Sequence, residues 1–454
     1  MKHSMKYAAM AALTAMCLSC TTKQPNPLAK EILNNPDLQV VDSMGRFILS
    51  QGFNAGSGYS QVWARDMNTF IETACEVVNP EEIRGALLVF FALQQPNNEM
   101  IDGYVLKGEF NWGDPRPYYS DAAPDHVGFK NTVETDQETS LIQIIGKYIR
   151  KTGDKSILKE VVNGQTVYER MVKMIDYLMT EKYDSKYGLL TGALTSDWGD
   201  VQADNEDPCD MNEHSVVTID AYDNAMFAIA LEYMAEMSEG EDKAKWEKMR
   251  KEIVANTRKH LWDEAANKII PHVYPNGTPD IVDFDENKIH YHGGTAIAIE
   301  AGILEHDEIG IVNTQMVRNV QQSGMPSIGL TVYPPYPEGF FRGGMAKAYI
   351  YQNGGDWTWF GGRMIQQLIA NGYIEEAYAE ITPMIDRVIK NKGFYEWYGQ
   401  GGVPSGSGHF KGSAGVLCKA IEMLREWAEN NKSSNPQLSS SASFLRLNVL
   451  SSLN

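Results

Sequence analysis

Apolar residues recur at helical spacing along most of the 454-residue chain. The pattern predicts about twelve helices, over 36–50, 64–78, 80–95, 134–152, 155–181, 216–237, 241–265, 292–304, 306–323, 356–371, 373–391 and 412–430. Short turns join neighbouring helices into pairs, and long glycine- and aromatic-rich segments intervene at 51–63, 96–133, 183–215, 324–355 and 392–411. Six helical hairpins with their long loops at one end predict an all-α (α/α)6 toroid.

The predicted helices differ in how much of their surface is apolar. The helix over 292–304 contains four consecutive apolar residues at 296–299, which suits a helix buried on all sides in an inner ring. The helix over 241–265 is strongly charged and suits an outer ring. A small β-hairpin is predicted around 268–270, because Pro-Asn-Gly at 275–277 is a turn signal.

The first residues have the pattern of an export signal. Lys2 and Lys6 precede a short apolar run over 7–16, and Leu-Ser-Cys closes the segment at Cys20. Because a polar stretch follows, the segment resembles a bacterial lipoprotein signal lipidated at Cys20, although Cys17 occupies the usual leucine position; an ordinary secretory signal is the alternative. The predicted divisions are a signal peptide over 1–19, a tether over 20–35, the catalytic domain over 36–430 and a disordered tail over 431–454. The periplasmic side of a membrane is the favoured location, with the cell surface as the alternative.

Composition narrows the class of ligand. The net charge of −19 argues against nucleic acid, whose phosphates need Lys and Arg, and favours a neutral ligand. Three cysteines remain outside the signal, with neither metal-type spacing nor a disulfide framework, and Cys75 and Cys418 are predicted to be core thiols. A monomer is expected, attached to a membrane only through its N-terminal lipid.

The segment 393–413 is the strongest functional signal. It places Glu396 between Tyr395 and Trp397 and is otherwise rich in glycine, so it can be neither a helix nor a regular strand. A loop of this length inside a compact domain is usually functional or disordered, and the aromatic residues argue against disorder. The segment predicts an active-site loop that presents a carboxylate; a structural turn with an exposed Glu is the alternative.

A second acidic loop lies at 188–200, where Asp197 and Asp200 flank a Trp-Gly pair. Asp197, backed by an aromatic residue, could have a raised pKa and act as a general acid, with Asp200 as the alternative acid. A pair of carboxylates from distant loops is the minimum for glycoside hydrolysis, and Asp197 with Glu396 is the predicted pair. The acidic run that follows Asp200 is interpreted as solvated surface, because its spacing fits no EF-hand; a structural Ca²⁺ stays open.

Tryptophans gather in or beside the long loops, at Trp63, Trp112, Trp198, Trp357, Trp359 and Trp397. Aromatic rings beside carboxylates and Arg suit stacking on sugar rings while polar groups bind hydroxyls. Asp66 is predicted to lie in the first turn of a helix, with an Arg65–Asp66 ion pair as the alternative, and Asp356 is predicted to cap the helix that follows it. The predicted substrate-binding residues are Trp63, Arg65, Asp66, Trp198, Asp356, Trp357, Trp359, Arg363 and Trp397.

Other chemistries lack their motifs. The chain has no phosphate-binding loop, dinucleotide fingerprint or Gly-x-Ser-x-Gly elbow. His290 and His292 lack an obvious third ligand, so zinc is not expected. No cofactor is therefore predicted.

From about 55 to 425 the chain resembles the six-hairpin glycoside hydrolases that include periplasmic trehalase, processing α-glucosidase I and the neutral/alkaline invertases. Residues 62–66, Val-Trp-Ala-Arg-Asp, resemble the invertases' Val-Phe-Val-Arg-Asp and the trehalase Trp-Asp that holds the non-reducing sugar. Residues 355–359 resemble the group's Gly-x-Trp-x-x helix entry. Residues 394–398 are similar to trehalase's Val-Glu-Lys-Tyr before a glycine-rich lid, where that Glu is the general base. The position of the general acid in this group corresponds to 195–200 in this chain. The Arg that follows the acid in the group is missing here, so the resemblance does not assign trehalose or sucrose as the substrate.

The resemblance implies an inverting exo-acting glycosidase for an α-linked glucoside or related hexoside, with Asp197 as acid and Glu396 as base. Six-hairpin folds also include lyases and sugar epimerases, so fold alone does not fix function. A lyase or epimerase would use His or Tyr, for which the candidates are Tyr395, His214, His292 and His409. A third alternative is a glycan-binding lipoprotein without catalysis.

Overall fold

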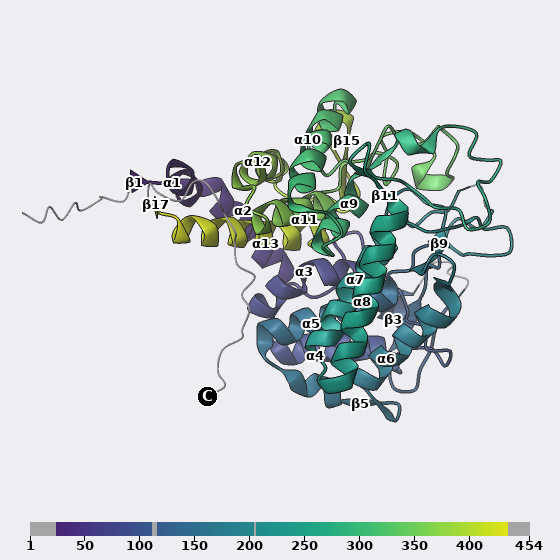
Figure 1. Ribbon diagram of the computed structural model, residues 1–454. Coiled ribbons are helices and arrows are strands. Elements are labelled where there is room, and N and C mark those ends of the chain that lie inside the picture. The colour runs from purple at the N-terminus through teal and green to yellow at the C-terminus, as the bar shows by residue number, and fades with distance from the viewer. Residues whose placement is uncertain (1–23, 111–115, 204–205, 435–454) are drawn as a thin grey trace, which may run out of the picture.

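The computed structural model describes residues 24–110, 116–203 and 206–434 (Figure 1). Six of its helices form a closed ring in which each packs against the next and the last against the first. In order they are α3 (Ala64–Val77), α5 (Gln137–Thr152), α7 (Ala221–Glu236), α9 (His292–Glu300), α11 (Thr358–Ala370) and α13 (Lys411–Asn430). This ring confirms the predicted (α/α)6 architecture.

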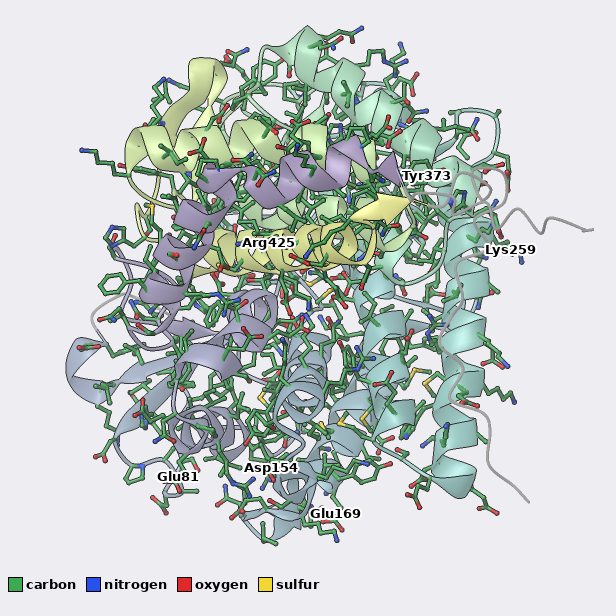
Figure 2. The ribbon with its side chains drawn as sticks, turned by 90° about the vertical axis from the view of Figure 1, so that its left-hand side faces the viewer. Glu81, Asp154, Glu169, Lys259, Tyr373 and Arg425 are labelled. Atoms are coloured by element: carbon green, nitrogen blue, oxygen red, sulfur yellow. The ribbon has the colours of Figure 1, made fainter. Side chains whose placement is uncertain are left out.

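A second set of helices alternates with the ring along the chain: α2 (Pro36–Leu49), α4 (Pro80–Ala92), α6 (Val167–Tyr177), α8 (Gly240–Leu261), α10 (His306–Ser323) and α12 (Ile374–Asn391). Several of them pack on the outside of a ring neighbour, as α4 does on α3, α6 on α5, α8 on α7 and α12 on α11. Charged side chains such as Glu81 of α4, Glu169 of α6 and Lys259 of α8 project outward from this layer (Figure 2).

Burial separates the two layers as the sequence predicts. Every residue of α9 except Glu300 is buried, whereas the 22-residue α8 buries only Trp246, Ile253, Thr257 and Leu261. An apolar surface on all sides is stable only where neighbouring helices remove it from water, and a charged helix needs contact with solvent. The pattern of polarity therefore decides which helix lies in which ring.

Local signals explain most helix ends. The side chains of Asn35 and Asn79 accept backbone N–H groups at the starts of α2 and α4, and a proline follows each of them. Gly153, in a left-handed conformation, ends α5. The predicted helix over 155–181 is broken, however, because Asn163 and Gly164 turn the chain between β5 (Val161–Val162) and β6 (Gln165–Thr166) before α6 begins.

The remaining strands are short and antiparallel. One three-stranded sheet contains β2 (Val62–Trp63), β3 (Gly103–Leu106) and β4 (His126–Phe129). Four two-stranded sheets pair β7 (Tyr183–Asp184) with β8 (Leu189–Leu190), β9 (Gly192–Ala193) with β10 (Val217–Thr218), β13 (His290–Tyr291) with β14 (Val332–Tyr333), and β15 (Trp397–Gly399) with β16 (Val403–Ser405). The predicted hairpin is present and includes β12 (Lys268–Ile269). Its other strand is β11 (Trp262–Asp263), which precedes β12 in the chain, so the turn of the hairpin is not the one at 275–277.

The ends of the domain differ from the prediction. The expected tether contains α1 (Pro27–Asn34), whose Ala29 and Ile32 are buried and which packs on α13. The start of the expected tail pairs with the start of the expected tether, because β17 (Ser433–Ser434) is antiparallel to β1 (Gln24–Pro25). The predicted signal peptide, Cys20 and most of the tail lie outside the described residues. Within the described ranges, no helix is both long and apolar enough to cross a membrane.

The inner-ring helices α3, α11 and α13 begin at the same end of the molecule. Arg65 and Asp66 in the first turn of α3, Trp359 in the first turn of α11, and Phe410 just before α13 all line one cavity. The long loops precede these helix starts, so the toroid brings segments from the whole chain to one place.

Candidate active site

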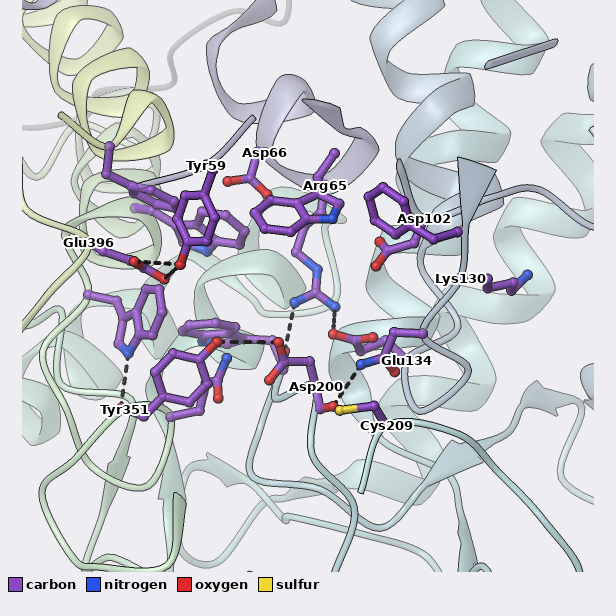
Figure 3. Close-up of a pocket in the computed structure, with 18 of the residues that line it drawn as sticks. Tyr59, Arg65, Asp66, Asp102, Lys130, Glu134, Asp200, Cys209, Tyr351 and Glu396 are labelled. Atoms are coloured by element: carbon purple, nitrogen blue, oxygen red, sulfur yellow. Dashed lines mark hydrogen bonds and ion pairs between the residues drawn. The ribbon is translucent and has the colours of Figure 1, made fainter. Parts of the chain in front are cut away.

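The cavity at this end of the ring has a volume of about 460 Å³, within the usual range for small-molecule sites. Aromatic and carboxylate side chains dominate its wall (Figure 3). It is lined by Tyr59, Trp63, Arg65, Asp66, Asp102, Phe129, Lys130, Asn131, Glu134, Trp198, Asp200, Asp207, Cys209, Asp210, Tyr351, Gln352, Trp357, Trp359, Glu396 and Phe410.

Glu396 lies in this wall as predicted, at the entry to the β15–β16 hairpin. The Tyr59 hydroxyl lies 2.9 Å from both of its carboxylate oxygens, and the Ser407 backbone N–H donates to Oε2 at 3.0 Å. Gly406 has a positive φ of 71°, and a Cβ there would collide with the carboxylate. The glycine-rich sequence therefore lets the loop close tightly around this one side chain.

Burial raises the pKa of Glu396, which is only 4% exposed. The hydrogen bonds from Ser407 and Tyr59 act in the opposite direction, and the negative charge of Asp200 adds to the increase. A carboxylate whose pKa is raised is a stronger base, which suits the role of a general base.

The structure corrects the predicted acid. Asp197 does not line the cavity; it is 1% exposed, and its two carboxylate oxygens accept the backbone N–H groups of Gly293 and Gly294 at 2.8 Å each. Those groups are in the first turn of α9, where unpaired N–H groups and the helix dipole favour an anion. Asp197 anchors its loop to the ring, and its carboxyl is sealed from solvent.

Asp200, three residues later, faces the cavity instead. Its Oδ2 accepts the Tyr351 hydroxyl at 3.3 Å, while its Oδ1 has no hydrogen-bond partner. Burial raises the pKa of Asp200, and the positive charge of Arg65 partly offsets that increase. Asp200 is thus a cavity-lining carboxyl with a raised pKa and one oxygen without a hydrogen-bond partner.

Arg65 lines the cavity, but its guanidinium is engaged by the protein. Its Nε donates to Asp136 at 2.6 Å, it forms an ion pair with Glu134, and its Nη1 donates to the Trp198 carbonyl at 3.2 Å. The alternative Arg65–Asp66 ion pair is not formed. Arg65 therefore ties α3 and the start of α5 to the loop that carries Asp200.

Two carboxyls beside Arg65 have raised pKa values because they are buried. Asp66 is 5% exposed, its Oδ1 has no hydrogen-bond partner, and burial with the nearby Glu396 charge raises its pKa. Asp102 has its pKa raised to about 7, mainly by burial. Asp66 was predicted, and it lies in the first turn of α3 as expected.

The predicted tryptophans contribute in different ways. Trp63, Trp198, Trp357 and Trp359 line the cavity. Trp198 stacks on Phe360 with ring centroids 4.4 Å apart, and the indole N–H groups of Trp198 and Trp359 have no hydrogen-bond partner. Buried unpaired N–H groups are costly unless a ligand accepts them, so the Trp359 N–H suits a sugar oxygen, whereas the Trp198 N–H lies against Gly293 of α9.

Three predicted binding residues do not reach the cavity. Asp356 is fully buried and does not cap α11; it accepts the Ser327 hydroxyl at 2.7 Å and pairs with Arg387 at 2.9 Å. Arg363 pairs with Glu300 at 2.8 Å. Trp397 is outside the wall and makes an edge contact with Tyr351. Trp112 lies outside the described residues.

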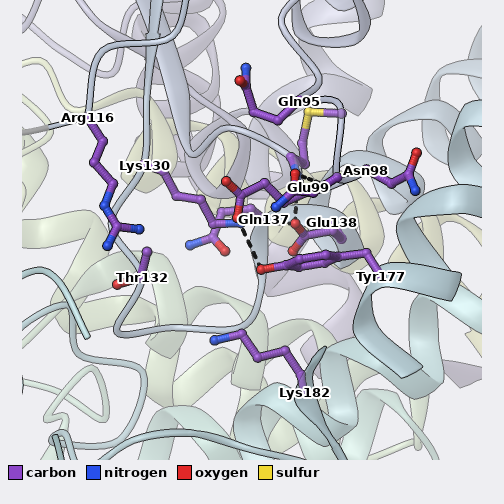
Figure 4. A network of polar contacts seen from close by, with 12 residues as sticks. Gln95, Asn98, Glu99, Arg116, Lys130, Thr132, Gln137, Glu138, Tyr177 and Lys182 are labelled. Atoms are coloured by element: carbon purple, nitrogen blue, oxygen red, sulfur yellow. Dashed lines mark hydrogen bonds and ion pairs between the residues drawn. The ribbon is translucent and has the colours of Figure 1, made fainter. Parts of the chain in front are cut away.

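Lys130 reaches the cavity from a polar network behind it (Figure 4). Its Nζ lies 3.0 Å from Glu138, 3.8 Å from Glu99 and 5.3 Å from the centroid of the Tyr177 ring. Tyr177 in turn donates to Glu99 at 3.1 Å. The charge of Lys130 is therefore largely balanced by groups outside the cavity.

Sequence reasoning missed Tyr59, Asp102, Glu134 and Tyr351, which all line the cavity. All but Glu134 lie within the long loops that were predicted to gather at one end, and Glu134 lies at the start of a predicted helix. Their position in these loops was the available sign that they line a site. It does not distinguish them from the other residues of the same loops.

The candidates for lyase or epimerase chemistry lie elsewhere. None of Tyr395, His214, His292 and His409 lines the cavity. His292 is buried, hydrogen-bonds to Asn319, and has its pKa lowered to about 3 by burial. In the described part of the chain, no group of three or more His, Cys, Asp or Glu side chains is arranged to hold a metal ion.

A family model described as the glycosyl hydrolase 94 superfamily, catalytic domain, matches residues 39–384. Among solved structures, the GH63 mannosylglycerate hydrolase from Thermus thermophilus, in complex with Tris and D-glycerate, is similar with a TM-score of 0.58 and 13% identity, over 84% of this chain and 99% of that one. A rhamnosidase from Klebsiella oxytoca with rhamnose bound is similar with a TM-score of 0.56 and 13% identity, over 87% of this chain. The match covers 64% of the rhamnosidase. No curated protein matches at the sequence level.

Proposed function

Because the chain belongs to the glycosyl hydrolase 94 superfamily, through its catalytic domain, we propose that this glycoside hydrolase acts with inversion, with Asp200 as general acid and Glu396 as general base. The observation that carries the proposal is that these two carboxyls, from loops almost two hundred positions apart, line the same cavity. Asp200 replaces Asp197 in the role that the sequence assigned, because Asp200, unlike Asp197, lines the cavity and has a carboxylate oxygen without a hydrogen-bond partner.

The proposed reaction uses both raised pKa values. The Asp200 carboxyl donates its proton to the glycosidic oxygen as the bond from that oxygen to the anomeric carbon breaks. On the opposite face of the sugar, the Glu396 carboxylate removes a proton from a water molecule, which attacks the same carbon. The two carboxyl groups of an inverting enzyme are about 6.5–9.5 Å apart, which leaves room for that water.

The aromatic wall supports an exo mode on an oligosaccharide. Trp198, Trp357, Trp359 and Phe410 line the cavity, are each at most 3% exposed, and contact one another in a continuous aromatic wall. A terminal sugar fits a closed end, whereas an internal sugar needs a cleft open on both sides. We propose a hexoside as the substrate and an α-linked glucoside as the first to test, on the resemblance to trehalase and processing α-glucosidase; a mannoside belongs in the same screen because of the mannosylglycerate hydrolase.

The test is a screen of α- and β-linked disaccharides in which NMR follows the anomer first released. The expected result is a product of inverted configuration, with Glu396→Gln reducing turnover about 10²–10⁴-fold. A retained configuration would overturn the inverting mechanism. Unchanged turnover in Glu396→Gln would remove Glu396 from it.

We also propose that the chain is an exported lipoprotein on the periplasmic side of a membrane. The support is the positive, apolar and Cys20-terminated pattern of the first twenty residues. Expression with a labelled fatty acid tests it, with Cys20→Ala as the control that should abolish labelling. Labelling that survives in Cys20→Ala would contradict the proposal.

A further inference from the structure

The cavity has two chemically different sides (Figure 3). Glu396 lies on the first, among aromatic rings. Asp102, Glu134 and Cys209 lie on the second, and Asp200 lies between the two sides. The charge of Asp200 raises the pKa of Glu396 and also that of Glu134, so Asp200 is within electrostatic reach of both sides.

The second side is the more open one. Cys209 is exposed, and the neighbouring Asp207 and Asp210 are partly exposed. In an inverting reaction the base and the water act on one face of the sugar, and the leaving group departs from the other face beside the acid. With the proposed roles of Asp200 and Glu396, the leaving group lies toward Asp102 and Glu134.

The cations that line the cavity in the described part of the chain are already paired. Arg65 binds Asp136 and Glu134, and Lys130 binds Glu138 and approaches Glu99. A negatively charged ligand on the second side would have to compete with these carboxylates for a partner. Such competition costs both the ion pairs and the desolvation of the new charge.

Acceptor atoms, by contrast, are left open there. Glu134 is 4% exposed, lines the cavity, and has no hydrogen-bond partner for its Oε2. Asp200 Oδ1, between the two sides, is likewise without a partner. A buried acceptor without a partner is costly, and a ligand that donates hydrogen bonds removes the cost. The atoms open on this side therefore require donors in the ligand.

We propose that Asp102 and Glu134 form a leaving-group site that takes hydrogen-bond donors, the hydroxyl or ammonium groups of a neutral or amino sugar, and rejects a leaving group with a carboxylate. This inference rests on the proposed function for its orientation. It makes Asp102 and Glu134 specificity-determining residues of the hydrolase.

The test measures binding of three hexoses that differ in charge: glucosamine, glucose and glucuronate. Calorimetry on the wild-type protein is expected to give glucosamine the lowest Kd and glucuronate the highest, with about a tenfold or larger difference between those two. Glu134→Gln and Asp102→Asn each remove one carboxylate while keeping its shape. Each is expected to reduce the preference for glucosamine over glucuronate several-fold.

Glu241→Gln is the matched control, because Glu241 is an exposed acid of α8 in the outer layer. It removes the same charge from the protein and should leave the preference unchanged. Circular dichroism of each variant separates lost binding from lost folding. If glucuronate binds the wild type as tightly as glucosamine does, or if Glu241→Gln changes the preference as much as Glu134→Gln, the proposal is overturned. Since binding needs no turnover, this outcome is independent of whether Asp200 and Glu396 perform hydrolysis.

Discussion

The loop that carries Glu396 and the loop that carries Asp200 use the same ingredients in different ways. Each holds at least one acid beside a tryptophan, in a stretch that also contains glycine. In the first loop the acid beside the tryptophan faces the cavity, held by Tyr59 and the Ser407 N–H. In the second, the acid beside the tryptophan is Asp197, which is bound to the start of α9, and the acid three residues later faces the cavity. The comparison teaches that one acid of a loop can anchor the loop to a helix while another acid of the same loop faces the cavity.

The largest effect on turnover is expected at Asp200, and it tests whether the two loops differ as described. Asp200→Asn keeps the shape of the side chain but cannot donate a proton of suitable acidity, so turnover should fall about 10²–10⁴-fold with the fold intact. Steady-state kinetics on a hexoside from the screen, with thermal unfolding as the control, measures both. Wild-type turnover in Asp200→Asn would return the role of acid to another group.

A smaller effect is expected when the base loses its hydroxyl partner. Tyr59→Phe removes a hydrogen bond that lowers the Glu396 pKa, so that pKa should rise further. The base works only when deprotonated, so the acidic limb of the pH–rate profile should move to higher pH, and kcat should fall about tenfold. The basic limb reports loss of the Asp200 proton and should stay nearly fixed.

Tyr395→Phe is the control for that measurement. Tyr395 neighbours Glu396 in the chain but does not line the cavity. Both variants remove a single tyrosine hydroxyl, but only the Tyr59 hydroxyl donates to Glu396. If both profiles move equally, the contact between Tyr59 and Glu396 does not set the pKa of the base.

Asp197→Asn should affect stability more than catalysis. The amide keeps one acceptor for the N–H groups of Gly293 and Gly294 but loses the charge that the start of α9 stabilises. The free energy of unfolding should fall by about 1–3 kcal/mol, while turnover of the folded protein stays within about tenfold of wild type. Denaturant titration beside kinetics at low temperature distinguishes this result from that of Asp200→Asn. A large loss of turnover without loss of stability would reverse the two roles.

The smallest effect is expected at Trp397, which is next to the base in the chain but outside the cavity wall. Trp397→Phe should change kcat/KM by no more than about twofold, since substitutions away from buried partners and ligands usually have small effects. A tenfold rise in KM would indicate that Trp397 contacts the substrate beyond the cavity.

The fold was largely predictable because its signals are local. The periodicity of 292–304 and 241–265 indicated the ring to which each helix belongs, and Asn35 and Asn79 mark helix starts in their own sequence. The break at Asn163–Gly164 was predictable in principle, since that pair favours a tight turn. The partner of β12 was misread because a stronger turn signal lies nearby at 275–277.

The site was predictable only in part. Glu396, Asp66 and the loop tryptophans were found because an acid or aromatic residue in a glycine-rich loop is unusual in a core. Asp356 satisfies the same description, yet it pairs with Arg387 from elsewhere in the chain. Arg363, in the helix that follows, likewise pairs with Glu300. Asp102 and Glu134 had no distinguishing neighbour in the sequence.

The sequence by itself determined the all-α ring, the gathering of its loops at one end and the acidic, aromatic character of what meets there. Those properties follow from the spacing and polarity of neighbouring residues, which act over a few turns of chain. Only the tertiary structure decided which carboxyls line the cavity and which anchor a loop. The role of each carboxyl depends on its nearest donor, which can be a backbone N–H of α9 or a guanidinium from α3, or on the lack of any donor. These donors lie about seventy to a hundred residues away from the carboxyl in the chain, so the local sequence does not reveal them.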